Sequence, residues 1–209
     1  MQLLLTGATG LVGRHVLRLA LADARVTTVV ALARKPLPAH PKMLAPFVDF
    51  DALAPDASWW RADAVICALG TTMKVAGSQA AFRQVDFEYP LAVARLARAA
   101  GTPAYVLNSA AGANPASRFF YNRVKGELER ELATLGFASL TQVRPGLIGG
   151  ERESVRTGEA TLALVLGALA PVLPRRWRIN PAENIAQALL EAAITAAPGV
   201  HVVASDHLT

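Results

Sequence analysis

The sequence predicts an α/β protein with a doubly wound parallel sheet. Short apolar runs rich in β-branched residues alternate with longer segments of helical periodicity along almost the whole chain. The length of 209 residues suits one domain, and 53% hydrophobic against 18% charged residues is typical of a compact protein with buried strands. We therefore expect residues 1–209 to form a single domain, in which residues 147–180 supply a small substrate or lid segment.

The first predicted strand runs directly into a glycine-rich turn and a helix. Residues 3–5 are apolar, and an Ala- and Leu-rich helical pattern begins near residue 11 and ends near residue 22. Glycines in such a turn let the chain bend sharply and let a phosphate approach the backbone, so the turn predicts a Rossmann-like dinucleotide site. A structural glycine loop is the alternative. The residues predicted to bind the cofactor here are Gly7, Thr9, Gly10, Leu11, Val12 and Gly13.

The other elements are expected to alternate along the chain. Apolar runs predict strands at residues 26–33, 47–50, 62–70, 104–109, 139–144 and 200–203. Helical patterns predict a helix around residues 59–60, one over residues 80–100 with a kink at Pro90, and others over residues 119–132 and 181–193. Residues 151–159 are charged and indicate a loop, whereas residues 161–173 predict an apolar helix that is too short to span a bilayer.

The second predicted strand ends at Arg34 and Lys35, and these residues predict the type of dinucleotide. Sites for NAD usually carry Asp or Glu at this point to bind the ribose hydroxyls, whereas an arginine accommodates the 2′-phosphate of NADP. The guanidinium of Arg34 offers a planar set of donors for a phosphate, and Lys35 adds charge. We therefore expect NADP(H) to be preferred over NAD(H), with a solvated strand-end arginine as the alternative.

Tyr121 and Lys125 are the candidate catalytic pair. Their spacing of four residues puts both side chains on one face of a helix. The phenol of a tyrosine has a pKa of about 10, but a neighbouring ammonium and a cationic nicotinamide favour its ionised form. Tyr121 would then donate a proton to a carbonyl oxygen as hydride arrives. Such pairs also occur by chance in helices, but this one follows a strand that ends at Ser109.

With these motifs in this order, the chain resembles the short-chain dehydrogenase/reductase superfamily. The matching parts are the glycine turn, the strand ends at residues 69–72 and 109, the tyrosine and lysine pair, and residues 144–146. More narrowly, residues 67–72, 120–127 and 144–146 resemble the atypical branch that contains the Tat-interacting oxidoreductase family. The resemblance covers nearly the whole chain.

The resemblance implies a role for each matching residue. Tyr121 would be the acid/base, Lys125 would tune it and hold the nicotinamide ribose, and Ser109 would bind the substrate carbonyl or the nicotinamide. For Arg144 and Pro145, a plain strand end and turn is the alternative. The residues with a cofactor-binding role beyond the glycine turn are Arg34, Lys35, Asp49, Phe50, Ala68, Leu69, Gly70, Thr71, Lys125, Arg144 and Pro145.

Two positions depart from the superfamily pattern. Ser109 is followed by Ala110 and Ala111, where relatives commonly carry consecutive serines, and Asp86 stands where the superfamily often has Asn. Both departures argue against turnover but leave cofactor binding unaffected. The favoured function is an NADPH-dependent oxidoreductase that acts on a small carbonyl or quinone. The alternatives are an NADP(H)-sensing regulatory protein with little or no turnover, and an NAD(P)-dependent epimerase or dehydratase.

Composition bears on partners and location. The net charge of +5 comes largely from scattered arginines, which suit anionic cofactors or substrates as readily as nucleic acid, and no nucleic-acid partner is expected. Cys67 is the only cysteine, so no intrachain disulfide is possible. Because the sequence also shows no secretory leader and no membrane-spanning run, a cytoplasmic location is expected. The histidines lack metal-site spacing, and a homodimer is a further expectation from the superfamily.

Overall fold

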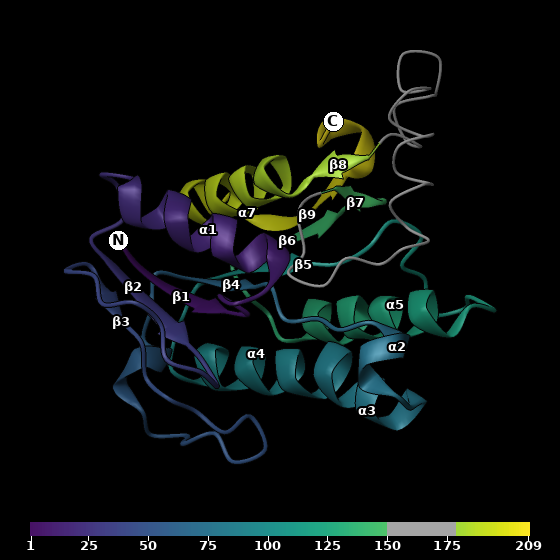
Figure 1. Ribbon diagram of the computed structural model, residues 1–209, viewed down its shortest axis with the longest axis horizontal. Coiled ribbons are helices and arrows are strands. Elements are labelled where there is room, and N and C mark those ends of the chain that lie inside the picture. The colour runs from purple at the N-terminus through teal and green to yellow at the C-terminus, as the bar shows by residue number, and fades with distance from the viewer. Residues whose placement is uncertain (150–178) are drawn as a thin grey trace.

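Seven parallel strands form the central sheet of the protein (Figure 1). A computed structural model describes residues 1–149 and 179–209. The strand order is β3-β2-β1-β4-β5-β6-β9, and every neighbouring pair is parallel. The doubly wound parallel sheet expected from the sequence is confirmed. The strands are β1 (Gln2–Thr6), β2 (Thr28–Leu32), β3 (Met43–Leu44), β4 (Ala64–Cys67), β5 (Ala104–Asn108), β6 (Ser139–Arg144) and β9 (Gly199–Ala204).

Helices cover both faces of the sheet (Figure 1). Helices α1 and α7 pack against each other on one face, and α3, α4 and α5 lie on the other. Alternate strand residues enter the two cores, so Leu3 and Leu5 face α1 and α7, whereas Leu4 faces α4 and α5. The helices are α1 (Leu11–Ala22), α2 (Met73–Ala76), α3 (Gln79–Arg83), α4 (Tyr89–Ala99), α5 (Phe120–Thr134) and α7 (Ala182–Thr195).

The direction in which strands are added to the sheet reverses between β1 and β4. From β1 the chain moves outward to β2 and β3, then returns to the other side of β1 with β4 and continues toward β9. Ligands of open α/β sheets bind at the carboxyl ends of the strands beside such a reversal. Thr6 of β1 pairs with Cys67 of β4, so the glycine turn after β1 and residues 68–71 after β4 leave the sheet side by side.

The third strand and the first short helix differ from expectation. The strand is Met43–Leu44 instead of residues 47–50, where Phe47 makes only an isolated bridge to Ala33. Pro46 precedes this bridge and has no amide hydrogen to continue the ladder, which explains the interruption. The helix expected around residues 59–60 is a 3₁₀ turn, Ser58–Trp60.

The helix expected over residues 80–100 is divided by a π-helical turn, Gln84–Glu88, which we call the π turn. The Tyr89 amide donates to the Gln84 carbonyl, five residues earlier. Pro90 comes just after the π turn, within a helical run that continues from Gln79 to Ala99. A proline ring and its missing amide hydrogen disturb the turn before them, so the irregularity expected at Pro90 takes the form of the π turn.

Two short strands form a separate parallel ladder, β7 (Ile148–Gly149) with β8 (Asn180–Pro181). The loop expected at residues 151–159, the apolar helix expected at residues 161–173 and most of the expected lid segment lie outside the described residues. Among the helices that the structure does describe, none is both long enough and apolar enough to cross a bilayer.

Helix α5 lies very close to the loop that follows β5, and Gly126 is the point of approach. A Cβ atom at Gly126 would clash with the backbone of Asn114 and Pro115. The Asn114 amide also donates to the Asn122 carbonyl at 3.0 Å, so the loop is fixed on the N-terminal half of α5. The glycine thereby sets the position of Lys125, its neighbour, relative to the end of β5.

We expect Gly126→Ala to destabilise the protein by about 1–3 kcal/mol, because the added methyl group overpacks against backbone atoms. Helix propensity alone predicts the opposite sign, a gain of about 1 kcal/mol for alanine inside a helix. Urea unfolding followed by circular dichroism measures the difference. Arg130→Ala, at an exposed position of the same helix, is the control and should stay within about 0.5 kcal/mol of the parent. A stabilised Gly126→Ala protein would contradict the close approach.

Candidate functional site

The glycine turn after β1 is shaped by contacts that exclude side chains. Gly7 has a φ of +82°, and a Cβ atom on it would collide with the Ala68 carbonyl. A Cβ atom on Gly13 would collide with the Gly7 carbonyl. Gly10 is the N-cap of α1 and carries no side-chain cap, and the first turn of α1 contains no acidic residue. The first turn of α1 therefore carries no carboxylate of its own that would compete with an anion for its amides.

The other predicted residues of this turn divide between surface and core. Thr9 is exposed and Leu11 is partly exposed, whereas Val12 is buried on the side of α1 that packs on the sheet. Thr9 and Leu11 are therefore accessible at the surface of the turn, and Val12 anchors the helix on the sheet.

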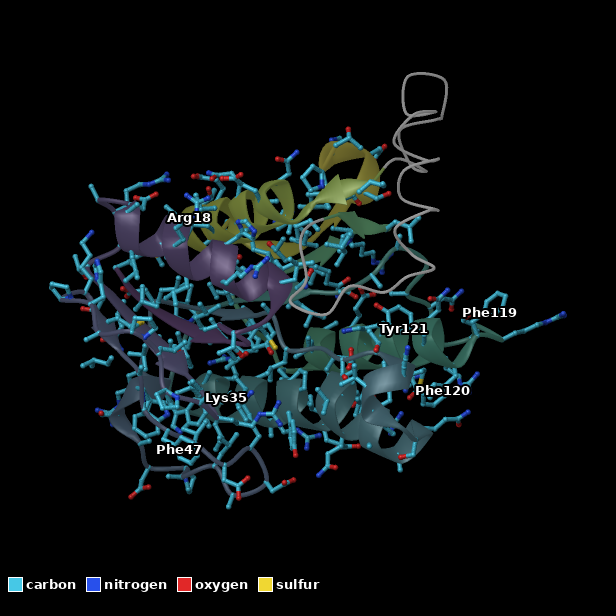
Figure 2. All side chains as sticks on the ribbon, in the orientation of Figure 1. Arg18, Lys35, Phe47, Phe119, Phe120 and Tyr121 are labelled. Carbon is cyan, nitrogen blue, oxygen red and sulfur yellow. The ribbon has the colours of Figure 1, made fainter. Side chains whose placement is uncertain are left out.

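Arg34 and Lys35 follow β2 and are both exposed. Figure 2 shows Lys35 on the side of the molecule that carries β2 and β3, well separated from Tyr121. Arg34 acts electrostatically on Tyr89, whose pKa is raised first by burial and then by its hydrogen bond to Asp51. The predicted 2′-phosphate residues thus lie near one end of the carboxyl edge of the sheet.

Asp49 and Phe50 have different surroundings, although both are implied in adenine binding. The Asp49 side chain is exposed. The Phe50 ring is buried and packs on Tyr89, with ring centroids 5.4 Å apart. Phe50 is therefore first of all a core residue that supports this end of the sheet.

The segment after β4 is held in place by Asp86 of the π turn. The Thr71 amide donates to Oδ2 of Asp86 at 2.7 Å. A Cβ atom on Gly70 would lie 3.5 Å from Oδ1 of the same carboxylate. Ala68 is partly exposed and Leu69 is buried, so this segment combines an open backbone with one core anchor.

Tyr121 and Lys125 share one face of α5 and differ in exposure. Tyr121 is 38% exposed, and its ring packs on Phe82 of α3 with ring centroids 5.6 Å apart. Figure 2 shows it with Phe119 and Phe120 at the N-terminal end of α5. Lys125 is 3% exposed, and its ammonium lies 2.7 Å from Oδ1 of Asp86. The phenol is accessible to a substrate, and the positive charge one turn away is buried.

The Asp86 carboxylate keeps the Lys125 ammonium charged. Burial alone would lower the pKa of Lys125, but attraction to Asp86, with smaller effects from Tyr121 and Cys67, raises that pKa above its usual value. Lys125 is therefore a fixed positive charge throughout the neutral pH range.

Ser109 lies just after β5 with a hydroxyl that has no partner. Its Oγ atom is buried and makes no hydrogen bond among the residues that the structure describes. Its amide donates to the Val143 carbonyl at 2.7 Å, which continues the pairing of β5 with β6. Leu107 enters the core beneath α4 and α5, so strand alternation puts Ser109 on the same side of the sheet as Lys125. Buried hydroxyls without partners are rare, and a bound ligand would complete this one.

Arg144 ends β6 and has a partner of its own. Glu129 is buried on α5, and its two carboxylate oxygens accept hydrogen bonds from the Arg144 guanidinium at 3.0 and 2.5 Å. The buried Pro145 follows, and its carbonyl accepts the Ala111 amide at 2.7 Å. These contacts tie the loops after β5 and β6 to each other and to α5.

Asn180 connects three separate segments near the end of β6. It is fully buried, its Oδ1 atom accepts the Gly146 amide at 2.7 Å, and its Nδ2 group donates to the Ser205 carbonyl at 2.8 Å. The turn after β6, the strand β8 and the C-terminal 3₁₀ turn Ser205–His207 are thereby held together.

Sequence reasoning does not find several residues that hold the candidate site together. Glu129 continues the four-residue spacing of Tyr121 and Lys125, and this repeat is a signal for a carboxylate on the same helix face. Asp86 is recognised from the sequence only as a departure from the superfamily pattern. Asn180 has no signal in the sequence, because its partners are backbone groups of distant segments.

A family model described as NAD(P)H-binding matches residues 7–158, which include the glycine turn, Asp86 and the Tyr121 and Lys125 pair. The chain belongs to this NAD(P)H-binding family. "Protein fmp52, mitochondrial" of Aspergillus fumigatus is 38% identical over 211 residues, which cover 93% of this chain and 88% of the relative.

Solved structures agree with this NAD(P)H-binding fold. A structure described as "MoeE5 in complex with UDP-glucuronic acid and NAD" superposes with a TM-score of 0.75 and 17% identity, over 97% of this chain and 75% of that one. UDP-glucose 4-epimerase from Thermotoga maritima superposes with a TM-score of 0.70 and 14% identity, over 99% of this chain and 77% of that one. Identities this low show the fold alone. The Rossmann-like, dinucleotide-binding fold expected from the sequence is confirmed.

The comparisons correct the expected location of this NAD(P)H-binding protein. Curated fungal relatives are named mitochondrial, which contradicts the cytoplasmic location expected from the sequence. The lone Cys67 shows only that no intrachain disulfide forms, and reducing conditions are not confined to one compartment.

We expect Asn180→Ala to lower the free energy of unfolding by about 2–4 kcal/mol, because two buried backbone groups lose their partners. Asn184→Ala is the matched control, since Asn184 makes one longer bond, 3.4 Å to the Leu208 carbonyl, from an exposed position of α7. The control should change stability by no more than about 0.5 kcal/mol. Equal effects of the two substitutions in urea unfolding would show that Asn180 does not join the three segments.

Proposed function

We propose that the protein is an NADPH-dependent oxidoreductase that transfers hydride to a small carbonyl or quinone, with Tyr121 as the general acid. The observation that carries the proposal is the accessible phenol of Tyr121 one helical turn from the buried, charged Lys125. Membership of the NAD(P)H-binding family supports the cofactor. The Ser109 hydroxyl lies on the same side of the sheet and has no hydrogen-bond partner within residues 1–149 and 179–209, which supports a subsite for the substrate oxygen.

The chain's own residues fit a dinucleotide. Gly7 and Gly13 let the turn after β1 and the start of α1 pack closely, and the first amides of α1 would bind the pyrophosphate. Lys125 carries three N–H donors, so it can hold ribose hydroxyls with the donors that Asp86 does not use. Arg34 and Lys35 would bind the 2′-phosphate at the other end of the site. When bound, the reduced nicotinamide supplies the hydride.

In the proposed reaction, the Ser109 hydroxyl donates a hydrogen bond to the substrate oxygen and orients the carbonyl. As hydride reaches the carbonyl carbon, Tyr121 transfers its phenolic proton to that oxygen, and an alcohol results. Lys125 stabilises the negative charge left on the phenol. Solvent then returns a proton to Tyr121, which is 38% exposed. A quinone that accepts a hydride and a proton in the same way becomes a hydroquinone.

A second function, NADP(H) sensing with little turnover, is favoured by the residues after Ser109. Ala110 and Ala111 follow Ser109, and an alanine carries no hydroxyl that could help to orient a substrate oxygen. Loss of one oriented donor typically lowers a rate by about 10²–10³-fold. A protein with the same cofactor affinity and negligible turnover would fit this function.

We expect Tyr121→Phe to abolish reduction of quinones, aldehydes and ketones by NADPH while the affinity for NADPH stays within about twofold. The substitution removes the transferred proton but keeps the ring that packs on Phe82. Turnover is followed by the loss of NADPH absorbance, and binding by calorimetry. Unchanged turnover in the variant would exclude Tyr121 as the acid.

Binding of NADPH without turnover in the parent protein, across a broad substrate panel, would favour the sensor. Cofactor that stays bound through purification would favour an epimerase or dehydratase.

We expect Arg34→Glu to weaken NADPH binding by about 10–100-fold and to change NADH binding by less than about threefold. The expected loss reflects one charge-assisted phosphate contact and new repulsion of the 2′-phosphate. Arg95→Glu makes the same charge change at an exposed position of α4 and is the control. Calorimetry with both nucleotides separates the effects. Equal weakening of NADPH and NADH would remove Arg34 from the 2′-phosphate site.

A further inference from the structure

The carboxylate of Asp86 holds two groups that belong to different elements. Its Oδ1 atom lies 2.7 Å from the Lys125 ammonium on α5, and its Oδ2 atom accepts the Thr71 amide after β4 at 2.7 Å. The two side chains of the pair are 4% and 1% exposed, so water does not share the interaction. Asp86 thus fixes both the buried Lys125 and the segment that follows β4.

The π turn that carries Asp86 also reaches the opposite end of the site. Gln84 donates from Nε2 to Oδ1 of Asp51 at 2.6 Å, and the Tyr89 hydroxyl lies 3.0 Å from both Asp51 oxygens. Asp51 follows Phe50, whose ring packs on Tyr89. A π turn inserts one residue into a helix and redirects the side chains around it, and such turns are frequent at functional sites.

Asp86 is the partner that offsets the effect of burial on the pKa of Lys125. The other titratable groups that act on Lys125 are Tyr121 from its own helix and Cys67 from β4. Glu129, one turn further along α5, is held by Arg144, and Glu127 is held by Arg83. Without Asp86, burial would be the dominant effect, and it lowers the pKa of a lysine.

We propose that Asp86 is the positioning residue of this site, which holds the Lys125 ammonium and the Thr71 amide in one arrangement for the cofactor. This inference rests on the proposed function, because it assigns Lys125 to the nicotinamide ribose. Asp86 itself is buried and acts through Lys125, not on the substrate. An asparagine would keep the bond to Thr71 but would lose the charge that Lys125 requires.

The test is NADPH binding as a function of pH, from about pH 6 to about pH 10. Lys125 in the parent protein has a raised pKa, so its charge persists to the alkaline end and affinity should show no loss there. In Asp86→Asn the pKa of Lys125 falls, and affinity should drop at least about 10-fold as pH rises through it. Asp86→Glu keeps the charge but displaces it, so its affinity should be weaker at every pH without a new alkaline step. Superimposable profiles for the parent and Asp86→Asn would overturn the proposal.

Lys125→Met shows that the alkaline step belongs to this lysine. Binding to Lys125→Met and to the double variant Asp86→Asn/Lys125→Met should be weak and without that step. Thermal unfolding without cofactor is the second readout. Lys125→Met should lower Tm strongly by leaving a buried carboxylate unpaired, and the double variant should recover at least about half of that loss. Additive changes in Tm would overturn the coupling of the pair.

These measurements separate this inference from the proposed function. If no substrate turns over but the pH profiles and the Tm cycle behave as expected, the oxidoreductase proposal fails and the role of Asp86 stands. If substrates turn over but Asp86→Asn binds NADPH with the parent profile, the proposed role of Asp86 fails and the oxidoreductase proposal stands.

Discussion

The buried ion pair between Lys125 and Asp86 is the interaction on which the candidate site depends. Two charges with almost no water around them are stable only together, and removing one partner of such a pair typically costs about 3–5 kcal/mol. The pair joins α5 to the π turn, and the second Asp86 oxygen adds the end of β4. These three elements must therefore all be in place before the lysine ammonium can be buried and held in position, which makes the site part of the folded core.

Close backbone contacts also hold elements of the candidate site in place, at positions where no charge is involved. At Gly7 and Gly13 the turn after β1 lies so near residue 68 and its own carbonyl that no Cβ fits, and at Gly126 helix α5 meets the loop after β5 in the same way. Each contact lies at the carboxyl edge of the sheet, where the two helices α1 and α5 begin or pass. Glycine is needed at these positions for proximity, and the result is a backbone surface that a nucleotide can approach.

Local patterns predict the sheet and the glycine turn, because strand alternation, helix periodicity and turn residues are encoded over a few neighbouring residues. The order of the elements, the turn at Gly7 and the shared face of Tyr121 and Lys125 follow from such patterns. The π turn and the displaced β3 do not, since each depends on how a proline fits the surrounding hydrogen bonds. Local patterns also do not predict the partners of Lys125 and Arg144, for another reason. The pairing of Lys125 with Asp86 and of Arg144 with Glu129 is set by tertiary packing between separate elements.

The same pair bears on the proton transfer of the proposed reaction. An ammonium that is already neutralised by a carboxylate attracts a phenolate less than a lone ammonium would, because the two charges act on it with opposite sign. Reduction starts from a protonated tyrosine and needs help only as the proton leaves, whereas oxidation of an alcohol needs the phenolate beforehand. Asp86 thus gives Lys125 a fixed place and a lasting charge at the cost of a weaker field at Tyr121. The phenolate is then less stabilised in either direction, so the carboxylate is compatible with the proposed carbonyl reduction without favouring it over the reverse reaction.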